Sequence, residues 1–287
     1  MKILAIGDFH GKFPKKFEKL IKKEKIDFIL SNGDYPSFSL EKVFFKKVYM
    51  HPEKNLWEVV GKKKYKEKTL KDLKNGESVL KKLNNLRIPV FTVLGNHDYP
   101  NPNDIRDLDR KLEKRFSWKW EDNRLKFYPE IIKKYKNIQR VDYSYGKFKD
   151  YIIIGARGHS VPGRVKSKAY RKYKKKLDTL FKKFNKENKE KKVIFLSHNV
   201  PYRTKLDKIT SKKAHEHAQK KHAGSKMFRR IIKKYQPILH VGGHIGEGMG
   251  KDKIGKTILM NPGEAHEGKA AVIEIDKGKV KKIKFIR

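Results

Sequence analysis

The fold of this chain is decided by one stretch, Phe91-Thr92-Val93-Leu94-Gly95-Asn96-His97-Asp98. A short apolar run rich in strand-forming residues ends abruptly in an amide, an imidazole and a carboxylate. This order is typical of a buried strand that delivers polar groups to the carboxyl edge of a sheet.

Four other apolar runs end in the same way. They lead into Gly7-Asp8-Phe9-His10, Asn32-Gly33-Asp34, Ser197-His198-Asn199 and Gly242-Gly243-His244. The Asp, Asn and His side chains among these residues are competent ligands for hard or borderline divalent metals. Five such strand ends predict a metal centre.

The rest of the chain alternates between strand and helix patterns. Strands are predicted at 2–6, 26–30, 89–94, 141–146, 151–155, 193–196, 238–241, 256–260, 270–275 and 280–286, and helices within 13–21, 41–86, 167–184 and 227–235. This alternation predicts an α/β fold. With no internal repeat or flexible linker, we expect one domain over 1–287 with lysine-rich, helical insertions at about 41–86, 103–137 and 163–191.

Composition excludes several classes of protein. The 287 residues include no cysteine, which excludes disulfides, thiolate metal sites and cysteine nucleophiles. The first strand begins at once, without the residue order of a signal peptide, and no uncharged apolar run approaches membrane-spanning length. We therefore expect a cytoplasmic protein without a membrane partner.

The charge is strongly unbalanced, with 73 Lys and Arg against 32 Asp and Glu, a net +41. A thermophilic source would raise Glu together with Lys, and here the acidic residues do not keep pace. The excess is partly concentrated at 164–192 (14 basic against 3 acidic residues) and at 203–234 (12 against 2). This pattern predicts nucleic acid, either DNA or RNA, including a ribosomal particle, as a partner. Because no base-reading motif is present, we expect contacts to the backbone.

The strand-end residues suit a centre of two metal ions. Asp34 can bridge the ions, because each carboxylate oxygen can bind one of them. Asp8 and His10 would hold one ion, and the other would be held by Asn96, His198 and His244. Two such ions polarise a phosphoryl group and generate hydroxide near neutral pH.

Two residues of the same stretch are the predicted catalytic pair. His97 would protonate the leaving oxygen, and Asp98 would hold the ring of His97 in its working orientation.

The five motifs occur in the order found in calcineurin-like metallophosphoesterases, and the chain resembles small archaeal and bacterial members of that superfamily. Further similarities are the stretches 202–207, 224–226, 252–255 and Asn261-Pro262-Gly263. The resemblance implies a four-layer α/β/β/α sandwich, two divalent ions (Mn, Fe, Zn, Ni or Mg), and hydrolysis of phosphomonoesters or phosphodiesters.

One position departs from the family pattern. The family usually ends its fifth motif with Gly-His-x-His, whereas Gly246 stands here in place of the second histidine. In the family that histidine serves the ion bound by Asp8 and His10, so the departure predicts a weaker or more open first site. Glu247 and His266 are the residues that could compensate.

Several residues near the motifs allow two interpretations. Arg157 and His159 either contact substrate phosphate or belong to an ordinary surface loop. His222, with His215 and His217, either contacts phosphate or lies on a solvated surface.

The aromatic residues of 107–135 are interleaved with Lys and Arg. They either stack on nucleobases or form the small core of an insertion.

Three functions are consistent with the sequence. The first is a dinuclear metallophosphoesterase, a phosphodiesterase or nuclease that acts on nucleic acid or nucleotides. The second is a catalytically weak or inactive member of the fold that binds RNA or a ribosomal particle. The third is a small-molecule or protein phosphatase whose charge reflects only the composition of its source.

Overall fold

The computed structural model describes residues 1–49, 51, 54–98, 118–124, 126–157, 168–211 and 219–287. Its first sheet has the order β12-β11-β1-β2-β3-β4 and its second the order β5-β6-β7-β8-β10-β9. The first consists of β1 (Lys2–Ile6), β2 (Phe28–Ser31), β3 (Val90–Thr92), β4 (Ile138–Arg140), β11 (Ala270–Asp276) and β12 (Lys279–Ile286). The second consists of β5 (Tyr145–Phe148), β6 (Tyr151–Ala156), β7 (Val193–Asn199), β8 (Leu239–Gly243), β9 (Gly250–Ile254) and β10 (Thr257–Asn261).

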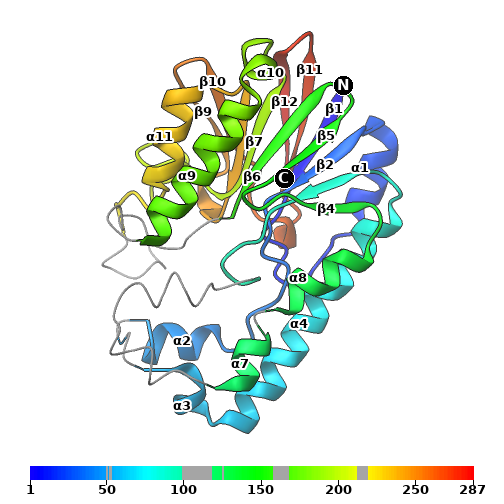
Figure 1. Ribbon diagram of the computed structural model, residues 1–287. Coiled ribbons are helices and arrows are strands. Elements are labelled where there is room, and N and C mark those ends of the chain that lie inside the picture. The colour runs from blue at the N-terminus through cyan, green and yellow to red at the C-terminus, as the bar shows by residue number, and fades with distance from the viewer. Residues whose placement is uncertain (50, 52–53, 99–117, 125, 158–167, 212–218) are drawn as a thin grey trace.

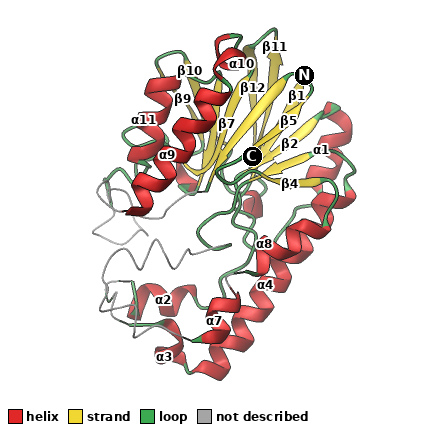
Figure 2. Ribbon diagram, viewed as in Figure 1, coloured by secondary structure: helices red, strands yellow, loops and turns green. Residues whose placement is uncertain are grey.

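The helices pack on the outer faces of these sheets or extend beyond them (Figures 1 and 2). They are α1 (Lys16–Glu24), α2 (Glu41–Lys47), α3 (Leu56–Val60), α4 (Lys62–Asn85), α7 (Lys119–Arg124), α8 (Phe127–Ile131), α9 (Lys168–Lys183), α10 (Asn185–Lys189) and α11 (Lys226–Tyr235). Short 3-10 turns lie at η1 (Ile132–Lys134), η2 (Gly246–Gly248) and η3 (Ala265–Glu267).

Three apolar clusters separate four layers. Ile3 and Ala5 of β1 face the second sheet, whereas Leu4 and Ile6 pack with α1 and α4 on the outer face. A third cluster joins the outer face of the second sheet to α9 and α11. A strand buried on both faces reads as a continuous apolar run, which is why these strands were recognisable in the sequence. The predicted α/β/β/α sandwich is confirmed.

Three strands differ from the prediction. Strand β4 was not predicted, because its three residues Ile138, Gln139 and Arg140 are too few and too polar to show a strand pattern. The predicted strand 141–146 is a crossing between the sheets at 141–144 followed by the start of β5 at Tyr145. The amide of Val141 donates to the carbonyl of Thr92 in the first sheet, and that of Tyr143 donates to the carbonyl of Gly155 in the second. Strand β9 was missed because its residues are mostly charged and partly exposed. Charged residues are common on edge strands, where they discourage pairing with other chains.

The helices of 41–86 form as predicted, and Gly61 separates α3 from α4. In Figure 1 the first half of α4 extends away from the sandwich beside α2, α3 and α7. The second half carries Leu80 and Leu83 into the core of the first sheet. The single domain and the insertion boundaries stay predictions.

Candidate metal centre

The topology brings the predicted ligands to one edge of the sandwich. Strands β1, β2 and β3 are parallel neighbours in the first sheet, and β7 and β8 are parallel neighbours in the second. Parallel neighbours end at the same edge. The two sheets are joined there by His198, whose Nδ1 lies 2.7 Å from the carbonyl oxygen of Asn32.

The chain turns sharply where it presents the ligands. Four predicted ligands have a left-handed backbone, with φ of 53° at Asp8, 42° at His10, 56° at Asp34 and 70° at His244. This conformation is uncommon for residues other than glycine and marks locally strained sites. Hydrogen bonds between the loops after β1 and β2 hold it, since the amide of Asp8 donates to Gly33 at 2.8 Å.

Glycine is required beside these ligands because the side chains approach the backbone closely. A Cβ on Gly95 would lie 2.0 Å from Oδ1 of Asp34, and one on Gly243 would lie 1.5 Å from the side chain of Asn32. Neither position can take a larger residue without displacing the centre. Both glycines belong to motifs that the sequence singled out.

The first ligand group is gathered around Nε2 of His198, which lies 2.8 Å from Oδ1 of Asn96. The same nitrogen lies 3.2 Å from Nδ1 of His244 and 3.5 Å from Oδ2 of Asp34. Atoms bound at about 2.0–2.2 Å to one ion stand roughly 3–3.5 Å apart, so the spacing fits a shared cation. In the neutral imidazole Nδ1–H donates to Asn32, which leaves Nε2 with a lone pair that faces other acceptors.

The second ligand group consists of Asp8, His10 and Asp34, whose ligand atoms all lie within 4.8 Å of one another. Asp34 belongs to both groups, as expected of a bridging carboxylate. Asp8 is held by Nδ2 of Asn32 at 2.9 Å and by the amide of His244 at 3.2 Å. The residues present therefore fit two cations that share one carboxylate.

The electrostatics of the centre suit cations. Burial, with the charge of Asp34 added, raises the pKa of Asp8 well above its usual value. Burial lowers the pKa of His10 to about 4 and that of His244 to about 3. Both imidazoles are therefore neutral near neutral pH, which is the form that binds metal.

His97 lies at the open side of the centre. Its side chain is 28% exposed, and its Nε2 is 4.0 Å from Oδ2 of Asp34. Its backbone amide donates to Oδ1 of Asp34 at 2.9 Å, which fixes the position of the residue. Its ring packs against those of His10 and Phe38. The ring is therefore accessible from solvent at the edge of the centre.

Asp98 makes a different contact from the one predicted. Its carboxylate accepts hydrogen bonds at 2.7 Å from the backbone amides of Asp34, Tyr35 and Gly95. Within the described residues no bond joins it to the ring of His97. The turn after β3 folds the carboxylate back under its own loop, so Asp98 fixes the strand ends that carry Asp34 and Gly95. Burial and the charge of Asp34 raise the pKa of Asp98, and the three amides oppose that rise.

The residues predicted to bind substrate are placed in different ways. Arg157 is buried, stacks near the rings of Tyr143 and Tyr173, and donates to the Tyr173 hydroxyl at 2.6 Å. His222 is partly exposed, and its Nδ1 lies 2.7 Å from Oδ1 of the buried Asp207. His159, His215 and His217 lie outside the described residues. A contact of Arg157 or His222 with substrate stays a prediction.

The residues that could compensate for Gly246 also differ. Glu247 turns away and accepts hydrogen bonds from the amide and hydroxyl of Thr210. His266 lies against His10, with ring centroids 5.0 Å apart. Asn32, Asp207 and Glu264 were not predicted to take part in the site. Asn32 lies in the motif Asn32-Gly33-Asp34 and Asp207 in the stretch 202–207, whereas nothing in the spacing of the chain marks Glu264.

The aromatic residues of 118–128 pack mainly with one another and with α3 and α4. Trp118 and Trp120 lie 5.0 Å apart and contact Tyr65, and Trp118 also contacts Trp57. Tyr128 is fully buried. These contacts favour a small core over a stacking surface for the described aromatics.

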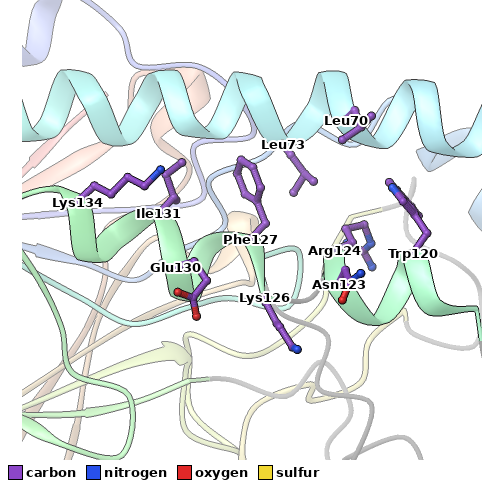
Figure 3. Close-up of a pocket in the computed structure, with 10 residues that line it drawn as sticks. All are labelled: Leu70, Leu73, Trp120, Asn123, Arg124, Lys126, Phe127, Glu130, Ile131 and Lys134. Carbon is purple, nitrogen blue, oxygen red and sulfur yellow. The ribbon is translucent and has the colours of Figure 1, made fainter.

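A groove of about 390 Å³ lies between α4 and the α7–α8 segment (Figure 3). Leu70, Leu73, Phe127 and Ile131 supply apolar lining, and Lys126 also lines it. None of the predicted metal ligands lines this groove, which is therefore separate from the predicted metal centre.

Comparisons with known proteins agree with this geometry. Residues 1–247 match the model of the calcineurin-like phosphoesterase family. One solved crystal structure is 19% identical with a TM-score of 0.66, and the match covers 100% of this chain and 98% of that one. The crystal structure of the protein TT1561 of Thermus thermophilus is 17% identical with a TM-score of 0.54, over 100% of this chain and 99% of that one. These two likenesses show a shared fold.

No curated protein matches the chain. Within the described residues, no helix is both long and apolar enough to cross a membrane.

Proposed function

The chain belongs to the calcineurin-like phosphoesterase family, and from this premise we propose that it is a metal-dependent hydrolase of phosphodiesters or nucleotides that uses two divalent ions. The observation that carries the proposal is the sharing of Asp34 between two ligand groups, one with Asp8 and His10 and one with His198 and His244. When bound, two such ions polarise a phosphoryl group and make water a stronger nucleophile near neutral pH.

The protein's own residues supply position and a proton. The hydrogen bond from His198 to Asn32 fixes the ring so that Nε2 faces Asp34. His97, at the open side, donates a proton from its ring to the leaving oxygen. Asp98 acts as a positioning residue, because it holds the backbone on which Asp34 stands.

The test is hydrolysis by protein stripped with a chelator and reloaded with Mn²⁺, Zn²⁺, Ni²⁺ or Mg²⁺. The substrates are p-nitrophenyl phosphate and bis(p-nitrophenyl) phosphate, a monoester and a diester. We expect turnover with at least one metal, and a loss of about 10³-fold or more in Asp34→Asn, because the single oxygen of a neutral amide cannot bridge two ions. The matched control is Asp276→Asn, an exposed acid at the end of β11. Reloaded wild-type protein that hydrolyses neither ester would contradict the proposal.

We also propose that the basic surface binds the phosphate backbone of nucleic acid. If every acidic side chain paired with one Lys or Arg, a net charge of +41 would still have no partner in the chain. Lys172, Lys175 and Lys176 are exposed on α9, where the apolar stripe faces the sheet. Lysines that neutralise phosphates release counterions, so the affinity must fall steeply with salt.

Fluorescence anisotropy with labelled RNA and DNA at increasing KCl tests this proposal. We expect binding at low salt, and the logarithm of the association constant should fall linearly with the logarithm of the salt concentration. Binding to neither polymer at low salt would contradict it.

Gly246 favours a second candidate function, an RNA-binding module of weak or no activity, because the family's second histidine is absent. This candidate predicts RNA binding that persists in His97→Ala and no hydrolysis with any metal. Metal-dependent turnover lost in Asp34→Asn would exclude it.

A further inference from the structure

Gly246 has no room for a side chain. It opens the turn η2, and a Cβ built on it would lie 2.2 Å from both Cδ and Oε1 of Glu264. The carboxylate of Glu264 therefore occupies the space beside the backbone of residue 246. A side chain at position 246 and Glu264 in this position exclude each other.

The segment that carries Glu264 is fixed to the strand end that carries Asp8 and His10. The amide of Ala265 donates to the carbonyl of Gly7 at 2.8 Å, and that of His266 donates to the carbonyl of Asp8 at 3.4 Å. The backbone next to Glu264 is thus held by hydrogen bonds to the strand end that carries the predicted ligands Asp8 and His10.

Glu264, His266 and His10 form a third group whose ligand atoms lie within 4.8 Å of one another. His10 is also a member of the group with Asp8 and Asp34. Nδ1 of His266 lies 3.2 Å from the carbonyl of Asp8, so a neutral ring donates there and leaves Nε2 to bind a cation. The edge-on packing of His266 on His10 brings the two imidazoles to one side of the centre.

The carboxylate of Glu264 lacks a direct ionic partner in the described part of the chain. It is half-buried, and no hydrogen bond or ion pair to it is formed among the described residues. A half-buried carboxylate beside His10 and next to the strand end of Asp8 favours a bound cation.

We propose that Glu264 and His266 bind, together with His10, the cation on the Asp8 side of the centre, with Glu264 in the place that a histidine at position 246 would take. The inference rests on the two-ion centre of the proposed function and names its missing ligands. A carboxylate in place of an imidazole makes the site more anionic and favours harder ions such as Mn²⁺.

The experiment counts bound metal independently of activity. Chelator-stripped full-length protein is titrated with Mn²⁺ by isothermal titration calorimetry, and electron paramagnetic resonance detects the spin coupling of two neighbouring ions. We expect two Mn²⁺ ions and coupling in wild type. In Glu264→Gln and in His266→Ala we expect one of the two affinities to fall at least about tenfold, with loss of coupling at limiting metal.

The matched control is Glu267→Gln, which removes an exposed acid from the same turn, where it pairs with Lys269. It should bind both ions like wild type. A swap sharpens the test: Gly246→His alone should weaken one ion, because its side chain meets Glu264, whereas Gly246→His combined with Glu264→Ala should restore two ions.

The outcomes separate this inference from the proposed function. If Glu264→Gln binds both ions with the affinities of the wild type, the ligand assignment is wrong, and the proposed function is unaffected. A wild type that binds two coupled ions yet hydrolyses no ester overturns the proposed function, while the effect of Glu264→Gln on binding still supports the ligand assignment.

Discussion

The strand-end centre and the helical segment 41–70 differ in how far their side chains are buried. In the centre, the side chains of Asp8, Asp34 and Asp98 are buried and tied by hydrogen bonds to backbone or side chains. In the helical segment, α2 has no buried residue. All three exposed large apolar side chains of the described chain, Phe45, Tyr49 and Leu70, lie there.

The difference teaches where sequence changes matter. The buried carboxylates of the centre each have fixed hydrogen-bond partners, so we expect a single substitution there to have a large effect. The helical segment has many exposed side chains and few buried ones, so we expect a single substitution there to change little. The predictions below test this contrast, from the largest expected effect to the smallest.

Removing the proton donor should have the largest effect of the four. His97→Ala should lower kcat by about 10²–10⁴-fold for an alkyl phosphate ester, whose leaving oxygen needs the proton. The loss should be smaller for a p-nitrophenyl ester, because p-nitrophenolate leaves without protonation. Steady-state kinetics on both esters, with metal content measured in parallel, check this. An equal loss for both leaving groups would show that His97 has another role.

The two halves of α4 should respond differently to the same truncation. Leu80→Ala should lower the free energy of unfolding by about 2–5 kcal/mol, since Leu80 is fully buried in the core of the first sheet. Leu70→Ala, at a side chain that is 39% exposed, should cost much less. Urea unfolding of both variants measures the difference. Equal losses would mean that the first half of α4 is as tightly packed as the second.

Asp98→Asn tests the backbone role of this carboxylate. Asn keeps one acceptor oxygen for three amides, so the free energy of unfolding should fall by about 1–3 kcal/mol. Denaturation in excess chelator separates this loss from any effect of bound metal. Wild-type stability would show that the three hydrogen bonds contribute little, and the positioning role would have to be abandoned.

The smallest effect on hydrolysis is expected on the basic surface. The triple change of Lys175, Lys176 and Lys182 to Gln should leave turnover of a small ester unchanged, because these exposed side chains lie on α9. The slope of log affinity for RNA against log salt should fall by about 0.7–0.9 for each lysine that contacts phosphate. A lower rate on the small ester would show that charge at α9 influences the centre directly.

Much of the fold was readable because its strands are buried on both faces. The runs that became β1, β7 and β11 contain almost only apolar residues, and this follows directly from their place between layers. The polar residues at their ends could be recognised for the same reason, since an Asp or His after such a run has no role in the core. The crossing at 141–144 could not be recognised, because its composition indicated a strand. The short strand β4 and the charged edge strand β9 were missed because their composition carries no strand signal.

The sequence alone determined which residue types stand at the strand ends and, through them, the family and the candidate metal ligands. Only the tertiary structure decided that Asp98 serves the backbone and that Glu264 fills the space beside Gly246. The physical reason is distance along the chain. A motif records neighbours within a few residues, whereas the contacts of Asp34 with Asp98 and of Gly246 with Glu264 join segments that meet only after the sheets have packed.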